Sequence, residues 1–338
     1  MPEEGLEPSS LSRHDFESCA YTNSATPALV LEYVKMKQKS TQKPTIIVIL
    51  GPTATGKSDL AVAVAKQLQG EVISADSRQI YTGLNIGTGK ITTREMCGIP
   101  HHLLDVVNPK KVFSVAEWQT LANKKIEEIL ARGHTPIITG GTGFYIQSIV
   151  DSIVLPEVAP NPVLRKKLEQ KSLEELVSML KKLDPKRIKT IDTKNPVRLI
   201  RAIEIATELG VVPKIKNLKS PYHFIQIGLT ADPEILKTRI HTRLLKRMKQ
   251  GMVAEATRLH TAGLSYKRMR QLGLEYRYLA DFLEKKITRA ELVENIYSGN
   301  IDYARRQMTW FKRDKKIQWV DVGEKKLFQK VMLLLQPN

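Results

Sequence analysis

The chain alternates short runs of apolar residues with longer stretches in which apolar residues recur every three or four positions. The short runs predict β-strands, and the longer stretches predict amphipathic α-helices. Strands are expected at residues 45–51, 71–77, 101–107, 135–141, 223–230 and 317–322. Because strands and helices follow one another in turn, the pattern predicts an α/β fold in which helices flank both faces of a parallel sheet.

Two regions depart from this alternation. Residues 1–43 are rich in Ser, Glu and Pro and contain no clear strand, so we expect a flexible N-terminal extension. Residues 156–213 show a continuous helical pattern interrupted by prolines, which predicts a helical insertion domain. The core domain is therefore expected in residues 44–155 and 214–338.

The charge of the chain narrows the choice of partners. The formal net charge is +18, and residues 239–338 alone hold 22 Lys and Arg against 10 Asp and Glu. A positive field of this size attracts polyanions, so nucleic acid is the expected partner. No apolar run reaches the roughly 18 residues of a membrane span. We expect a cytoplasmic protein that has no membrane partner and works as a monomer.

The octapeptide GPTATGKS at residues 51–58 lies between the first expected strand and a helical pattern. Its GxxxxGKS spacing is typical of a P-loop, whose backbone N–H groups surround a phosphate, and it predicts a P-loop NTPase-like sheet. The lysine adds a positive charge, and the serine hydroxyl suits Mg²⁺. The residues expected to bind phosphate are Gly51, Thr53, Ala54, Thr55, Gly56, Lys57 and Ser58, with Ser58 as the metal ligand.

Polar residues follow the second expected strand in the segment SADSRQIYTGLNIGTGK, residues 74–90. In parallel sheets, ligands bind at the carboxyl ends of the strands, so Asp76 is a candidate functional carboxylate. In a kinase or hydrolase that uses ATP, Asp76 or Asp105 would bind the metal. Alternatively, Asp76 or Ser77 caps the start of a helix. The residues alone leave these interpretations open.

Several segments together resemble the tRNA dimethylallyltransferase family. They are GPTATGKS, ISADSRQIYTGLNIGTGK, PHHLLD, GGTGFYIQS, NPVRLIRAIEI, RIHTRLLKRMKQGMVAEATRL and YARRQMTWFKRD, in this order over residues 44–320. The resemblance implies transfer of a dimethylallyl group from dimethylallyl diphosphate to N6 of the adenosine 3′-adjacent to the anticodon in tRNA. The P-loop would then hold the diphosphate with Mg²⁺. No cysteine follows Cys97, so the zinc finger of eukaryotic members is missing, which favours a bacterial or organellar type.

The resemblance also implies roles for individual residues. Asp76 would be the general base, with Lys57 and Thr142 as further catalytic residues, and Arg239 and Arg243 would close over the diphosphate. The residues expected to contact the tRNA anticodon stem-loop are Asp76, Ser77, Arg78, Gln79, Thr142, Arg165, Asn195, Pro196, Val197, Arg198 and Leu199. Many members have alanine at the position of Gly89, a difference that we expect not to disturb its loop. A role of Asp76 as a Mg²⁺ ligand stays open.

Two other functions remain compatible with the sequence. An adenylate isopentenyltransferase uses the same donor with a free nucleotide as acceptor, but it would need neither the insertion nor the basic C-terminal region. An RNA-binding protein without catalysis would need neither Lys57, Ser58 nor Asp76, all of which are present.

Overall fold

The computed structural model describes residues 43–336. Nearly all of the expected N-terminal extension therefore lies outside the described residues. The chain divides into two compact units. The first comprises the chain up to Val150 and from Ser220 onward, and the second comprises Asp151–Lys219. Each unit has a hydrophobic core of its own.

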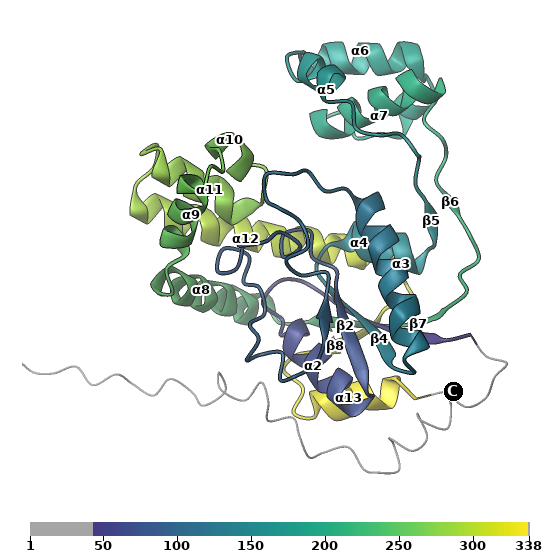
Figure 1. Cartoon of the computed structure of the whole chain (residues 1–338), viewed down its shortest axis with the longest axis vertical. Helices are drawn as coiled ribbons and strands as arrows, with labels where there is room; N and C mark the ends of the chain where they lie inside the picture. The colour runs from purple at the N-terminus through teal and green to yellow at the C-terminus, as the bar shows by residue number, and fades with distance from the viewer. Residues whose placement is uncertain (1–42, 337–338) are drawn as a thin grey trace, which may run out of the picture. The chain divides into compact units, whose positions relative to one another are not determined.

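The first unit is built on a six-stranded sheet (Figure 1). Its strands are β1 (Thr45–Leu50), β2 (Gly70–Ser74), β3 (His101–His102), β4 (Thr135–Gly140), β7 (His223–Thr230) and β8 (Gln318–Asp321). They lie in the order β3-β2-β4-β1-β7-β8, and every neighbouring pair is parallel. All six expected strands occur in this one sheet, and the predicted α/β fold class is confirmed.

The third strand is much shorter than the predicted residues 101–107. Only His101–His102 pair with β2. The φ angles of Leu103 and Asp105 are 61° and 54°, a left-handed conformation that is incompatible with a strand. The rest of this apolar run is therefore a loop that leaves the sheet.

Alternate side chains of β1 enter two different hydrophobic clusters. Ile46, Val48 and Leu50 belong to one cluster, and Ile47 and Ile49 belong to the other. This division follows from the strand geometry, because successive side chains point to opposite faces of a sheet. Both faces are buried, as in other parallel sheets covered by helices.

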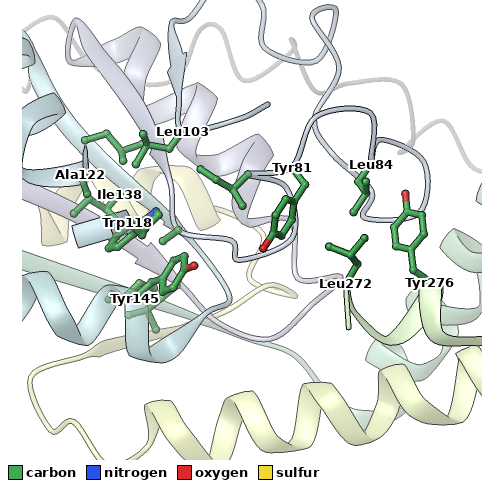
Figure 2. Packing of buried hydrophobic residues seen from close by; sticks show 14 of the residues in the cluster. Tyr81, Leu84, Leu103, Trp118, Ala122, Ile138, Tyr145, Leu272 and Tyr276 are labelled. Carbon is green, nitrogen blue, oxygen red and sulfur yellow. The ribbon is translucent and has the colours of Figure 1, made fainter. Parts of the chain in front are cut away.

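Helices cover the two faces. The cluster of Ile47 includes residues of α2 (Lys57–Gln67) and α13 (Leu327–Leu334), whereas the opposite cluster includes residues of α3 (Val115–Ala131) and α4 (Gly143–Val150). In that opposite cluster Trp118 stacks on Tyr145 with ring centroids 4.6 Å apart (Figure 2). The Trp118 indole donates a hydrogen bond of 3.1 Å to the carbonyl of Ser74, so its one polar atom is satisfied in the core.

A group of helices completes the first unit after β7. They are α8 (Pro233–Lys249), α9 (Met252–Thr261), α10 (Tyr266–Met269), α11 (Leu274–Leu283) and α12 (Arg289–Phe311). Tyr276 of α11 and Leu272, which lies between α10 and α11, pack near Leu84 (Figure 2), and all three side chains are buried in the same cluster. This packing connects the C-terminal helices to the loop that follows β2.

The second unit is small and helical. It contains α5 (Pro162–Leu168), α6 (Leu173–Leu183), a short 3₁₀ helix η2 (Arg187–Lys189) and α7 (Pro196–Leu209). Its ends pair as a two-stranded antiparallel ribbon of β5 (Ile153–Val154) and β6 (Lys216–Asn217). Because the ribbon belongs to the unit, Asp151–Lys219 is longer at both ends than the helical pattern at residues 156–213. None of the helices within residues 43–336 is long and apolar enough to cross a membrane.

Candidate functional site

The P-loop connects β1 to α2, as the octapeptide predicts. Gly51 approaches the backbone of Leu229 so closely that a Cβ would lie 2.5 Å from its carbonyl oxygen. Ala54 and Gly56 have φ angles of 64° and 83°, which turn the loop into the helix. Gly56 is the N-cap of α2 and has no side chain to cap the first turn. The amides of this turn are therefore available to an anion.

Two cations lie at this loop. Lys57 Nζ donates a 2.6 Å hydrogen bond to the carbonyl of Pro52, and Arg243 of α8 donates one of 3.4 Å to Thr53 Oγ1. Burial, and next the charge of Arg243, lower the pKa of Lys57 to about 7. Burial, and next the charge of Arg247, lower the pKa of Arg243 to about 10. The loop therefore combines helix-terminal amides with two crowded positive charges, and a bound anion would stabilise both.

Asp76 begins the turn after β2. Its Oδ1 accepts hydrogen bonds from the amides of Arg78 and Gln79 at 2.8 and 3.3 Å. These bonds stabilise a turn, and the structure has no helix between β2 and β3, so the alternative that Asp76 or Ser77 caps the start of a helix is wrong. Its Oδ2 forms no hydrogen bond with any residue in the described range. Thr142, which follows β4, accepts a 3.0 Å hydrogen bond from the amide of Ser77. The carboxyl ends of the two neighbouring strands thus bring Asp76, Ser77, Gln79 and Thr142 together.

Gly89 connects the Asp76 turn with the P-loop. Its carbonyl accepts hydrogen bonds from Arg243 Nη2 at 3.3 Å and from Gln79 Nε2 at 3.4 Å. Gly89 has a φ of 59°, and a Cβ built there would lie 2.0 Å from Arg243 Nη2. The expectation that glycine here, where many members have alanine, does not disturb the loop stays a prediction. An alanine would displace the guanidinium that reaches Thr53.

Gln307 of α12 is a site residue that the sequence reasoning missed. Its Oε1 accepts a 2.9 Å hydrogen bond from the amide of Thr53, and its Nε2 donates one of 2.8 Å to the carbonyl of Gly141. The side chain is buried and ties the P-loop to the end of β4. A signal was present, because helical spacing places Gln307 on the same face as the buried Ala304 and Phe311. A polar residue on a buried helix face needs such partners.

The structure does not bring every expected residue to the P-loop. Arg239, one turn before Arg243 on α8, is exposed and makes no hydrogen bond or ion pair within residues 43–336. Asp105, the other candidate metal ligand, pairs with the Lys90 ammonium at 2.5 Å. It is therefore already neutralised, which leaves Asp76 as the better candidate of the two.

The residues near the loop fit a Mg²⁺ ion only together with a phosphate ligand. Within the described part of the chain, no group of three or more His, Cys, Asp or Glu could hold a metal. Ser58 is exposed in the first turn of α2, and its hydroxyl makes no hydrogen bond with a described residue. Mg²⁺ commonly binds one or two protein oxygens together with substrate phosphates. One hydroxyl beside an anion-binding loop is a donor set of this kind.

The second unit holds six of the other residues expected at the site, in different settings. Arg165 forms a bidentate ion pair with the buried Glu204, in which Nε and Nη2 donate hydrogen bonds of 2.9 and 2.7 Å to the two carboxylate oxygens. Asn195 caps α7 by accepting a 3.2 Å hydrogen bond from the amide of Arg198. The Arg198 side chain is 57% exposed and faces Asp192 at 3.5 Å. Pro196 and Val197 are exposed, whereas Leu199 is fully buried and cannot contact a ligand through its side chain.

The chain is similar to known proteins over most of its length. The sequence model of the IPP transferase family matches residues 79–314. The tRNA dimethylallyltransferase of Anoxybacillus flavithermus is 39% identical over 289 residues, which cover 84% of this chain and 93% of the relative. The tRNA dimethylallyltransferase 2 of Treponema denticola is 42% identical over 287 residues, which cover 82% of this chain and 96% of the relative.

Solved structures show the same fold. The tRNA isopentenylpyrophosphate transferase of Bacillus halodurans aligns with a TM-score of 0.66 at 34% identity, over 87% of this chain and 96% of that chain. A eukaryotic dimethylallyltransferase acting on tRNA aligns with a TM-score of 0.71 at 24% identity, over 86% of this chain and 78% of that chain. From these matches we conclude that the chain belongs to the tRNA dimethylallyltransferase (IPP transferase) family of prenyltransferases.

Proposed function

We propose that this protein transfers the dimethylallyl group of dimethylallyl diphosphate to N6 of the adenosine 3′-adjacent to the anticodon in tRNA. One observation carries the proposal. The carbonyl of Gly89 bonds both to Arg243 beside the P-loop and to Gln79 in the Asp76 turn. An anion-binding loop and a carboxylate with a free oxygen therefore share one site, as a reaction between a diphosphate donor and an amine requires.

The P-loop would bind the diphosphate of the donor. The amides at the start of α2, Lys57 and Arg243 would stabilise the negative charge that builds up on the leaving diphosphate. Mg²⁺, held by the Ser58 hydroxyl together with phosphate oxygens, would add further neutralising charge. Gln307 fixes the amide of Thr53 and so supports the shape of the loop.

Asp76 would act as the general base. As the bond between the adenine nitrogen and the allylic carbon forms, the carbon–oxygen bond to the diphosphate breaks, and the diphosphate leaves with the electron pair. The proton of the amine would pass to Oδ2 of Asp76, because Oδ1 is already occupied by two backbone amides. Thr142 would orient this turn through its hydrogen bond with Ser77.

The acceptor would be an extruded base of a tRNA anticodon stem-loop. A stacked adenine exposes its N6 poorly, so such enzymes take the base out of the loop. Arg78 is exposed beside Asp76 and donates a 3.1 Å hydrogen bond to the carbonyl of Gln271, which gives it a fixed place at the edge of the site. Exposed residues of the second unit, such as Val197 and Arg198, would also contact the RNA. We place the reaction in the cytoplasm and expect the monomer to perform it.

A direct assay tests this function. The protein is incubated with dimethylallyl diphosphate and tRNA, AMP or ATP in parallel, and the products are digested to nucleosides and identified by mass spectrometry. We expect isopentenyladenosine only from tRNA, and none from a tRNA in which the adenosine beside the anticodon is guanosine. Prenylated AMP or ATP would instead assign the protein a free-nucleotide acceptor. The absence of any product, with RNA binding intact, would leave a binding role alone.

A further inference from the structure

The GTGK loop, residues 84–90, is held in place by side chains of the C-terminal helices. Glu255 of α9 accepts hydrogen bonds from three successive amides, those of Asn85, Ile86 and Gly87, at 3.1, 2.8 and 2.8 Å. The Tyr276 hydroxyl donates a 2.6 Å hydrogen bond to the same carboxylate. One buried carboxylate therefore satisfies four donors and fixes the first half of the loop.

Arg247 of α8 holds the same half of the loop by its carbonyls. Its Nε donates a 2.6 Å hydrogen bond to the carbonyl of Ile86, and its Nη2 donates to the carbonyl of Gly87. Glu275 of α11 lies 3.3 Å from the guanidinium and balances its charge. Arg247 is only 7% exposed, so it is not available to a ligand in solution.

Arg243 meets the other half of the loop. Arg243 and Arg247 are four residues apart on α8, which places them on the same face of the helix. Arg247 bonds Ile86 and Gly87, while Arg243 bonds the carbonyl of Gly89 and reaches Thr53 of the P-loop. The position of the Gly89 carbonyl, and with it the direction of the Arg243 guanidinium, depends on where the first half of the loop is held.

We propose that Arg247, held by Glu275, is a positioning residue for the prenyl donor: it fixes the GTGK loop so that the Gly89 carbonyl aims Arg243 at the diphosphate. The inference rests on the proposed function, in which Arg243 binds the diphosphate. Arg247 itself touches no substrate. The competing explanation is that Arg247 and Glu275 only stabilise the packing of α8 and α11.

A double-mutant cycle separates the two explanations. The affinity for dimethylallyl diphosphate is measured by calorimetry with the full chain and Mg²⁺, for Arg243→Met, Arg247→Lys and the double variant. Lysine keeps the charge of Arg247 but lacks the planar guanidinium, whose separate Nε and Nη2 atoms reach the two carbonyls. We expect each single variant to bind the donor roughly tenfold more weakly, and the double variant to bind no more weakly than Arg243→Met alone, because residues that act through one another are not additive. Lys246→Met, an exposed neighbour on α8, should match the wild type.

The melting temperature of each variant, measured by thermal unfolding, shows whether a loss of affinity comes from a folding defect. If Arg247→Lys does not fold, Glu275→Gln replaces it in the same cycle, because glutamine keeps the shape but loosens Arg247. Losses in affinity that multiply in the double variant would overturn the inference and leave the proposed function standing. An unchanged donor affinity in both Arg247→Lys and Glu275→Gln, with lowered melting temperatures, would overturn it in the same way. If Arg243→Met binds the donor normally, both the inference and the proposed diphosphate site fail.

Discussion

Donor binding should depend on pH through Lys57. Burial, and next the positive charge of Arg243, lower the pKa of this ammonium to about 7, while the nearby Asp76 acts in the opposite direction. The diphosphate prefers the charged lysine, so binding raises this pKa and takes up a proton above pH 7. Affinity should therefore be highest below pH 7 and should fall as the pH rises, because the free protein must first be protonated.

The size of the effect follows from the pKa. With a value of about 7, roughly a tenth of the free protein carries a charged Lys57 at pH 8, and roughly a hundredth does so at pH 9. The dissociation constant for the donor should then rise by roughly tenfold for each unit of pH in this range. Arg243 does not contribute there, since its pKa is lowered only to about 10 and it stays charged.

Calorimetric titration of dimethylallyl diphosphate between pH 7 and 9, in buffers with different protonation enthalpies, gives both the affinity and the number of protons taken up. Lys57→Met is the matched control, because it removes the titrating group and leaves the ionisation of the donor itself unchanged. It should bind weakly and with little dependence on pH. A wild-type affinity that is the same at pH 7 and 9 would refute the reasoning, and so would a steep dependence that persists in Lys57→Met.

Three further predictions concern the rest of the site. Asp76→Asn should slow single-turnover transfer by roughly 10²- to 10⁴-fold with both substrates still bound; recovery at high Mg²⁺ would show a metal ligand instead of a base. Gly89→Ala should weaken donor binding several-fold by displacing Arg243, while its melting temperature stays within a few degrees of that of the wild type. The control is Gly98→Ala, which also has a positive φ but has open space around it, and which should bind the donor normally. Binding of tRNA should weaken steeply as salt is raised from about 50 to 200 mM, because many phosphates are neutralised at once, and a flat response would exclude the basic surface as the RNA contact.

The sheet could be predicted from local pattern because each of its strands lies within or directly beside a short apolar run of the sequence. One predicted strand, at residues 101–107, is too long. The apolar run continues past His102, but the backbone turns at Leu103 and Asp105. The contact that accompanies this turn joins Asp105 to Lys90, fifteen residues away. A window of a few residues contains no trace of such a contact, so hydrophobic pattern alone extends the strand.

The P-loop was predictable for a similar reason, since its glycines, lysine and serine occur within eight consecutive residues. Its partners were harder to predict. Arg239 and Arg243 lie four residues apart on α8, which places them on the same face of the helix, yet only Arg243 reaches the loop. Gln307 is 254 residues from Thr53 in sequence, and its role depends on where α12 packs. Helical periodicity shows that Gln307 faces inward, but it does not show which backbone atoms form hydrogen bonds with its side chain.

The P-loop and the Asp76 turn are linked through the main-chain carbonyl of Gly89. Because every residue type has such a carbonyl, the sequence could not reveal this link. Any residue at position 89 supplies a carbonyl, but a Cβ there would lie 2.0 Å from Arg243 Nη2, so the guanidinium would have to shift. The side chain that a Cβ at this position would meet lies 154 residues later, and a loop motif considered by itself does not contain it. A difference at one loop position must therefore be judged together with the helix that faces it. In this chain, that helix also carries Arg247, which holds the loop at its other end.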